Sequence, residues 1–211
     1  MKEYLKLYLI ADYLYFDKDF YRRVELAIRG GVTAVQFRFK SVNDDIAFEI
    51  AKNLKDICSE SCVPFFINNR PDFALILDAD GVHLGQEDLP VNEVRKILPG
   101  KIIGVSAGSL EEITRVKGKD FDYISFGSVF ATPTKVDAGH PIGLNGLKNL
   151  VEVSPNKPKI AIGGITLENV ESVIGCGVDG VAIASAIMKS DDPEDIARRF
   201  RDLIEKAIAG K

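Results

Sequence analysis

The chain has 211 residues, of which 46% are hydrophobic and 27% are charged, and its formal net charge at pH 7 is −4. This length and composition suit a single domain, residues 1–211, with a full hydrophobic core, and the acidic balance disfavours broad binding to nucleic acid or to anionic membranes. No apolar run approaches the roughly 20 residues of a membrane span and the first residues lack a signal-peptide layout, so we expect a cytoplasmic protein.

Short apolar runs recur along the whole chain, and helical patterns separate them. The runs are rich in valine, isoleucine and aromatic residues, which is typical of strands that are buried on both faces. We expect strands at 7–11, 33–37, 64–67, 80–84, 102–106, 121–127, 159–164 and 179–184. We expect helices at 17–31, 44–58, 71–77, 91–98, 110–116, 144–151, 166–175 and 191–210.

The longest helical patterns also predict which side of each helix is buried. For 191–210 we expect Asp192 to cap the helix and Pro193 to occupy its first turn. The apolar spacing predicts three buried stripes: Phe20, Val24, Ala27 and Ile28 in the first helix, Ile46, Ile50, Leu54 and Ile57 in the second, and Ile196, Phe200, Leu203, Ala207 and Ile208 in the last.

The regular alternation of strand and helix indicates an α/β fold with a parallel sheet. Eight such units in about 200 residues fit a closed (β/α)₈ TIM barrel near its minimum size. The rival is an open doubly wound sheet, which usually carries a G-x-G-x-x-G turn after its first strand. The corresponding segment here is IADYLYFD, which has no such turn, so we predict the barrel.

The barrel places the residues that follow each strand around one mouth, where barrel enzymes keep their chemistry. We therefore expect four cations to surround one pocket and two carboxylates to lie opposite them. Such a concentration of positive charge in an acidic protein favours a multiply charged anion. The cations are Arg38, Lys40, Arg70 and Lys135, and the carboxylates are Asp12 and Asp88.

Two segments indicate phosphate binding. The stretch FGSVFATPTK brings Thr132, Thr134 and Lys135 together directly after a strand, although a polar surface loop is the commoner meaning of such a run. Gly163 and Gly164 end the seventh strand and allow the backbone to approach a ligand, with Ala184 and Ser185 after the eighth strand, where a helix begins; the alternative is that the glycines only turn the chain. Two anion sites would suit two phosphorylated substrates.

The cysteines and histidines do not form a convincing metal or nucleophile set. Cys58 and Cys62 are four residues apart in a helical pattern, but no histidine or further cysteine lies nearby to complete a zinc site. We expect these two and Cys176 to be buried or half-buried structural thiols. His83 is expected to pack as a hydrogen-bonded strand residue and His140 to lie in a loop before the sixth helix.

Seven segments together resemble the thiamine-phosphate synthase family (thiamine-phosphate pyrophosphorylases), including its thiazole tautomerase branch. They follow the order of the family's motifs over roughly residues 5–190, and their combination is highly specific. They are VQFRFK, FINNRPDFA, ADGVHLGQEDLP, IGVS, FGSVFATPTK, AIGGI and VAIASAI.

The resemblance implies a transferase reaction. Hydroxymethylpyrimidine diphosphate loses diphosphate, and the nitrogen of a thiazole monophosphate captures the resulting pyrimidinylmethyl cation, which gives thiamine phosphate. Such a dissociative step depends on stabilising the leaving group, so cationic side chains and Mg²⁺ are expected to dominate. The implied partners are small phosphorylated molecules, and the sequence leaves open whether the chain forms a homo-oligomer.

The resemblance also implies roles for individual residues. The catalytic residues it implies are Arg38, Lys40, Ser106 and Lys135. The pyrimidine diphosphate would be held by Gln36, Arg38, Lys40, Asn68 and Ser106, with Lys135 on its diphosphate. The thiazole phosphate would be held by Thr132, Thr134, Gly163, Gly164, Ala184 and Ser185. Magnesium would be bound by Asp88, directly or through water, and by Asn69.

At two positions the chain departs from the family's pattern. Asn69 stands where the family usually has an acidic metal ligand, and Gly108 stands where it often has a histidine. The thiazole tautomerase alternative would use a histidine near the end of the fifth strand, and Gly108 counts against it. A non-catalytic barrel that binds thiazole or thiamine phosphate is the other alternative, with Asn69 as its main support.

Overall fold

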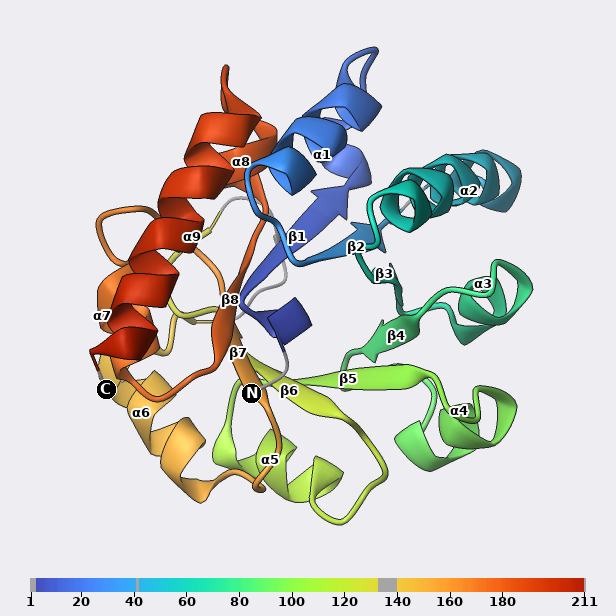
Figure 1. The fold of residues 1–211 in the computed structure, drawn as a ribbon. Helices are drawn as coiled ribbons and strands as arrows, with labels where there is room; N and C mark the ends of the chain where they lie inside the picture. Colours follow the sequence, from blue (N-terminus) through green and yellow to red (C-terminus); the bar gives the residue numbers. More distant parts are fainter. Residues whose placement is uncertain (1–2, 41, 133–139, 211) are drawn as a thin grey trace.

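A computed structural model of the chain describes residues 3–40, 42–132 and 140–210. Within these residues, eight parallel strands close into a barrel in sequence order, and helices surround them (Figure 1). The strands are β1 Leu7–Asp12, β2 Ala34–Arg38, β3 Phe65–Asn68, β4 Gly81–Leu84, β5 Ile102–Ala107, β6 Tyr123–Phe126, β7 Lys159–Ile162 and β8 Gly180–Ile183. The prediction of a single (β/α)₈ TIM barrel is confirmed.

The helices follow the strands as the sequence predicts. They are α1 Phe20–Arg29, α2 Asp44–Glu60, α3 Pro71–Ile76, α4 Val91–Ile97, α5 Leu110–Val116, α6 Gly143–Val153, α7 Val170–Gly175, α8 Ser185–Met188 and α9 Pro193–Ala209. Two short 3₁₀ helices, η1 Glu3–Leu5 and η2 Tyr13–Tyr15, flank β1. In the described part of the chain, no helix combines the length and the apolar character that crossing a membrane requires.

Residues of each strand alternate between two hydrophobic cores. In β1, Leu7 and Leu9 belong to the outer core between strands and helices, whereas Tyr8 and Ile10 belong to the inner core of the barrel. Both faces of the strands are therefore buried, which explains their nearly continuous apolar sequences. At the carboxyl ends of the strands, polar side chains take over the inward positions.

The last helix closes the outer ring, since α9 packs against both α1 and α7 (Figure 1). Asp192 caps α9 by accepting a hydrogen bond from the Asp195 amide at 3.0 Å, and Pro193 occupies the first turn, as predicted. Of the predicted stripe, Phe200 is buried, while its other four members are half-buried against the outer core.

The predicted stripe of α2 is confirmed for Ile50 and Leu54 and wrong for Ile46 and Ile57. Ile46 is 44% exposed and Ile57 is only half-buried. The buried side instead comprises Ala47, Ile50, Ala51, Leu54 and Cys58. Small residues reach the core here because alanine lets the helix approach the sheet closely, and a pattern that counts only large apolar residues overlooks them.

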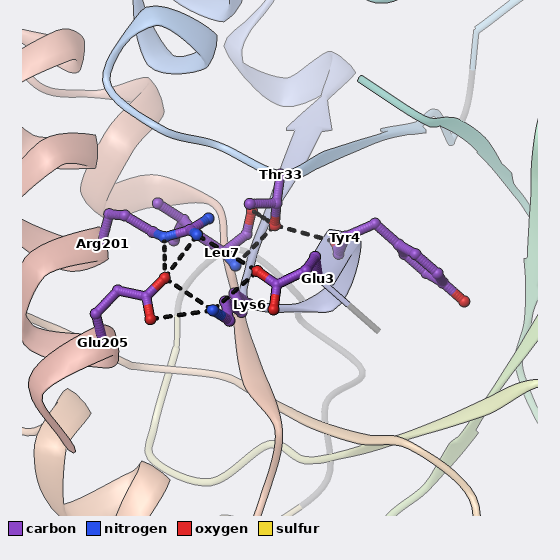
Figure 2. Close-up of polar contacts among 7 residues, drawn as sticks. All are labelled: Glu3, Tyr4, Lys6, Leu7, Thr33, Arg201 and Glu205. Carbon is purple, nitrogen blue, oxygen red and sulfur yellow. Dashed lines mark hydrogen bonds and ion pairs between the residues drawn. The ribbon is translucent and has the colours of Figure 1, made fainter. Parts of the chain in front are cut away.

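The amino-terminal end of the barrel is closed by η1 and by a cluster of ionic contacts. Leu5 is fully buried and joins the inner core. Next to it, the Lys6 ammonium lies 2.8 Å from a Glu3 oxygen and 2.9 Å from a Glu205 oxygen of α9, and Arg201 lies 2.6 Å from Glu205 (Figure 2). The ligand-binding end must therefore be the opposite mouth.

Candidate active site

A cavity of about 570 Å³ lies where the carboxyl ends of the strands meet. Every described residue to which the family resemblance assigns a catalytic, substrate-binding or metal-binding role lines it. These residues are Gln36, Arg38, Lys40, Asn68, Asn69, Asp88, Ser106, Thr132, Gly163, Gly164, Ala184 and Ser185. The two remaining predicted residues, Thr134 and Lys135, lie outside the described residues.

The end of β2 supplies two cations and an amide. Gln36 and Arg38 share the inward side of this strand because side chains alternate across it. Arg38 forms an ion pair with Asp12 at the end of β1, and the side chains are 15% and 4% exposed, respectively. The second Asp12 oxygen accepts a hydrogen bond from the Leu14 amide at 2.9 Å. Asp12 thus lies beside Arg38 and orients it, rather than opposite the cations as predicted.

The prediction that Arg70 joins the pocket is wrong. Its guanidinium contacts Asp44 at 2.8 Å and Asp72 at 2.6 Å, and it stacks over the Phe73 ring with 4.4 Å to the centroid. Hydrogen bonds from Arg70 hold the pKa of the Asp44 and Asp72 carboxyls below their ordinary range. Arg70 is therefore part of the contact between α2 and α3 on the outside of the barrel, and it is not among the residues that line the cavity.

Asn69 and Asp88 hold the two loops in which a metal is expected. Asn69 has a left-handed backbone, with φ of 63°, a conformation that asparagine and aspartate adopt more readily than most residues. The backbone N–H of Asn69 donates to the backbone carbonyl oxygen of His83 at 2.8 Å. One Asp88 oxygen accepts from the Gly85 amide at 2.6 Å, which fixes the loop after β4.

The charges around the cavity favour a divalent cation in addition to a phosphorylated ligand. The described lining residues include two basic side chains, Arg38 and Lys40, and four carboxylates, Asp12, Glu87, Asp88 and Glu112. Among these described residues the carboxylates outnumber the basic side chains, so a cation bound together with a diphosphate would offset negative charge. Mg²⁺ prefers oxygen ligands, and one or two protein carboxylates usually suffice when phosphate oxygens complete its shell.

The donor set fits that use of magnesium. Asn69 and Asp88 offer hard oxygen ligands at one side of the mouth. Among residues 3–40, 42–132 and 140–210, no three His, Cys, Asp or Glu side chains group as a metal-binding cluster. A cation held only by the protein would need such a cluster, whereas one shared with a diphosphate does not.

Two glycines shape the opposite side of the cavity. Gly163 and Gly164 have φ values of 104° and 62°, which favour glycine. A Cβ atom on Gly163 would lie 2.0 Å from the Ser128 Oγ, and one on Gly164 would lie 2.6 Å from the Ala131 carbonyl oxygen. Only glycine fits at both positions, and the backbone there borders the cavity next to Ala184 and Ser185.

Sequence reasoning missed the floor of the cavity. Tyr8 lines it from β1 and Tyr123 lies fully buried in β6 beneath it. Burial raises the pKa of both hydroxyls far above the ordinary value, so both remain protonated. The period-two alternation that places Asp12 inward also places Tyr8 inward, and this signal was present in the sequence.

The predictions for the histidines and cysteines have mixed outcomes. His83 is 8% exposed and hydrogen-bonded at both ring nitrogens, as predicted, and exposed His140 lies outside the helices and lines the cavity. Cys58 is buried, which raises the pKa of its thiol to about 12, and Cys176 is half-buried. The prediction is wrong for Cys62, which is exposed because it lies in the turn after α2.

Comparisons with known proteins show the family of the chain. The family profile described as thiamine monophosphate synthase matches residues 7–187. A thiamine-phosphate synthase of Archaeoglobus fulgidus is 42% identical over 210 residues, which cover 100% of this chain and 98% of that protein. A thiamine-phosphate synthase of Clostridium novyi is 42% identical over 200 residues, covering 94% of this chain and 98% of that protein.

A solved structure shows the same architecture. The thiamine phosphate pyrophosphorylase of Pyrococcus furiosus superposes with a TM-score of 0.87 at 39% identity, and the match covers 98% of both chains. The match therefore extends across the whole barrel. The chain belongs to the thiamine monophosphate synthase family.

Proposed function

We propose that this chain is a thiamine-phosphate synthase, which joins hydroxymethylpyrimidine diphosphate to hydroxyethylthiazole phosphate and releases diphosphate. The observation that carries the proposal is the cavity: one mouth gathers the residues of both expected anion sites, in a chain related end to end to synthases. A cytoplasmic location would suit these small, charged substrates.

The proposed reaction breaks the C–O bond between the pyrimidinylmethyl carbon and the diphosphate, and the electron pair leaves with the diphosphate. The thiazole nitrogen then donates its lone pair to the pyrimidinylmethyl cation and forms the C–N bond. Because the barrier lies in charge separation, groups that stabilise the departing diphosphate contribute most. No side-chain nucleophile is required.

The residues divide this work by position. Arg38 and Lys40 border the cavity from β2 and would bind the diphosphate, together with Lys135, whose role rests on the sequence motif. Asn69 and Asp88 would hold Mg²⁺, which when bound neutralises negative charge that builds up on the diphosphate oxygens. Gly163 and Gly164 would bring backbone N–H groups to the thiazole phosphate.

The geometry at Gly108 disfavours the tautomerase alternative. A Cβ atom there would lie 2.9 Å from the Gly127 carbonyl oxygen, and the Gly108 amide donates to Glu112 at 2.5 Å. A histidine at this position would have to displace the backbone at the end of β6. The group that the alternative requires is thus absent from the sequence, and its place is sterically closed.

The deciding experiment incubates the purified chain with both substrates and Mg²⁺ and measures thiamine phosphate and diphosphate. We expect both products in equal amounts. Conversion of the thiazole tautomer without thiamine phosphate would establish the tautomerase alternative, and tight binding of thiamine phosphate without turnover would establish a non-catalytic barrel.

A variant at Lys135 tests the leaving-group role. Lys135→Ala should lower turnover by about 10² or more, as expected for the loss of one group that stabilises developing charge. Steady-state kinetics would measure it, with a circular dichroism spectrum to verify the fold. Turnover equal to that of the unsubstituted enzyme would remove Lys135 from the mechanism.

A further inference from the structure

A chain of hydrogen bonds crosses the interior of the barrel beneath the cavity. The Gln36 amide nitrogen donates to the Tyr8 hydroxyl at 3.1 Å, and that hydroxyl lies 3.1 Å from the Tyr123 hydroxyl. The Tyr123 hydroxyl lies 2.9 Å from Nδ1 of His83, and Nε2 of His83 lies 2.8 Å from Oγ of Ser106. We call these five residues the Gln36–Ser106 chain.

The inner core holds this chain in one geometry. The Tyr8 and Tyr123 rings pack against each other at 6.0 Å and both contact the Phe66 ring. A Cβ atom on Gly104 would lie 2.1 Å from the Tyr123 ring, so the place of that ring depends on a glycine in β5. Both tyrosines are at most 1% exposed. The hydroxyls are therefore fixed by packing and not only by their hydrogen bonds.

The chain has a preferred direction, which the Gln36 amide sets. Because Tyr8 accepts from that amide, its own proton is best given to Tyr123, whose proton then goes to Nδ1 of His83. In the reverse direction the Tyr8 hydroxyl would accept twice, and the hydrogen bonds of the described residues offer no acceptor for its proton. A buried hydroxyl without an acceptor is unfavourable. The forward direction satisfies every buried proton.

The forward direction fixes what the two ends offer to a ligand. In this direction Nδ1 of His83 accepts, so the ring proton lies on Nε2, which donates to Ser106. The Ser106 hydroxyl therefore points its own proton elsewhere, and this residue lines the cavity. At the other end, one N–H of the Gln36 amide is donated to Tyr8, which fixes the orientation of the amide and leaves its oxygen to accept from a ligand. The cavity floor thus presents a donor at Ser106 and an acceptor at Gln36.

We propose that Tyr8, Tyr123 and His83 are positioning residues that polarise Ser106 and Gln36 and so make the enzyme select an aminopyrimidine over an oxopyrimidine. This inference rests on the proposed function. A 4-aminopyrimidine offers a ring nitrogen as acceptor beside an amino group as donor, which complements the floor. A 4-oxopyrimidine offers the reverse, a ring N–H beside a carbonyl oxygen, and would place donor against donor and acceptor against acceptor.

The first test compares the two pyrimidine diphosphates as substrates. Sites built to hydrogen-bond a substrate can reject a mismatched analogue by about 10⁴, so we expect kcat/KM for the amino substrate to exceed that for the 4-oxo analogue by at least about 10³. Tyr123→Phe keeps the ring but interrupts the chain. It frees His83 and Ser106 to reverse, and the ratio should fall by at least about tenfold.

A matched control distinguishes the effect of the hydrogen-bond direction from the loss of any tyrosine hydroxyl next to Phe66. Tyr4 stacks on the same Phe66 ring, at 6.0 Å, but is not a member of the chain. Tyr4→Phe should leave the amino-to-oxo ratio within about twofold of the unsubstituted value, because it keeps the ring and removes only a hydroxyl that is not part of the Gln36–Ser106 chain. If Tyr123→Phe lowers both rates and leaves the ratio unchanged, Tyr123 is merely structural and the inference is overturned.

The second test does not depend on turnover. A long-range ¹H–¹⁵N correlation spectrum distinguishes the two neutral histidine tautomers. The whole protein contains only two histidines, His83 and His140. The variant His140→Gln assigns the signals. We expect His83 with its proton on Nε2, shifting toward a mixture in Tyr123→Phe. A proton on Nδ1 in the unsubstituted protein would overturn the proposed direction.

The two tests also separate this inference from the proposed function. If neither pyrimidine diphosphate reacts, the proposed function fails, while the tautomer spectrum still decides the direction of the chain. If the amino substrate reacts and the 4-oxo analogue reacts as well, the proposed function stands and the inference is overturned.

Discussion

Single residues at the mouth of the cavity are held by partners before any ligand arrives. Arg38 is paired with Asp12, whose second oxygen caps η2 through the Leu14 amide. Asp88 fixes its loop through the Gly85 amide. Each group is thus positioned by a protein contact, which lowers the ordering cost of binding a charged ligand.

The Arg38–Asp12 pair predicts a stability effect that can be separated from activity. Arg38→Met should lower the free energy of unfolding by about 3 kcal/mol, because it leaves the buried Asp12 carboxylate without its cationic partner. Adding Asp12→Asn should recover most of that loss, since the asparagine oxygen can still accept from Leu14 and no charge remains buried. Urea unfolding of the two variants measures this.

The activity of the same two variants should not follow their stability. Neither restores the cation at the end of β2, so both should remain impaired with the pyrimidine diphosphate. A double variant that is no more stable than Arg38→Met would show that the pair contributes through packing alone.

Asn69 predicts a change in the magnesium requirement. Asn69→Asp adds a carboxylate at a backbone conformation that aspartate tolerates, so the Mg²⁺ concentration for half-maximal rate should fall by roughly tenfold, since charge count tunes the binding of hard cations. Asp88→Asn is the matched change in the opposite direction. It keeps an oxygen for the Gly85 amide but removes the charge, and it should nearly abolish the response to Mg²⁺.

The measurement is the rate as a function of Mg²⁺ concentration for each variant. An unchanged curve for Asn69→Asp would mean that Asn69 is not a ligand, and that Asp88, water and diphosphate oxygens hold the metal.

At the scale of elements, the ends of helices and the glycines of strands decide how closely the layers approach. The α9 helix packs against α1 and α7, so its first turn determines where the outer ring closes. Gly30 at the end of α1 is required there, because a Cβ atom on it would lie 2.2 Å from the Glu194 carbonyl oxygen of α9.

The cap of α9 gives a prediction for stability. Asp192→Ala removes the acceptor of the Asp195 amide at 3.0 Å and should lower the free energy of unfolding by about 1 kcal/mol. For a chain of this size, that loss corresponds to a decrease in Tm of about 2–4 °C. Asp191→Ala is the control, since that neighbouring carboxylate is exposed and does not cap the helix. Equal effects of the two substitutions would contradict the capping role.

At the scale of the whole molecule, the segment around η1 contacts α9 at the amino-terminal end of the barrel. Lys6 joins Glu3 and Glu205 there, and Arg201 of α9 completes the cluster (Figure 2). The Thr33 hydroxyl adds hydrogen bonds to the Tyr4 and Leu7 carbonyls at 3.0 Å. This cluster fixes η1 across the end of the barrel, opposite the cavity.

The cluster predicts how stability depends on pH. The hydrogen bond from Lys6 lowers the pKa of Glu205, so its contribution is present above the ordinary glutamate pKa of about 4.5 and is lost as pH falls through the lowered value. Hydrogen bonds to Glu3 and Glu205 raise the pKa of Lys6, so its contribution is complete below about 10.5 and is lost as pH rises beyond that.

Glu205→Gln tests this window. Because the Glu205 side chain is 42% exposed, water screens the pair, and the loss of unfolding free energy at pH 7 should be only about 1 kcal/mol or less. The difference should shrink as pH falls below about 4.5. Thermal unfolding between pH 3 and about 7 measures it. The control is Glu171→Gln in α7. Its exposed partner is Lys206 of α9, and the substitution should change the free energy of unfolding little. A pH-independent difference for Glu205→Gln would contradict the assignment.

The sequence by itself determined the barrel and the identity of most cavity residues. Eight apolar runs alternating with helical patterns leave few topologies, and the closed barrel places every strand end at one mouth. Twelve of the predicted residues, from Gln36 to Ser185, line one cavity for that reason. The cap at Asp192 was likewise local, since it depends on four consecutive residues.

Only the tertiary structure decided which way side chains point and whom they pair with. Strands buried on both faces show no alternation of apolar and polar residues, so the inward position of Tyr8 follows only from its spacing to Asp12, and the contacts of Tyr8 with Tyr123 are not marked in the sequence. Arg70 lies just after β3 and Arg38 ends β2, yet Arg70 turns outward to Asp44 and Asp72 while Arg38 pairs with Asp12. These choices depend on contacts between residues distant in sequence, and such contacts exist only once the barrel has closed.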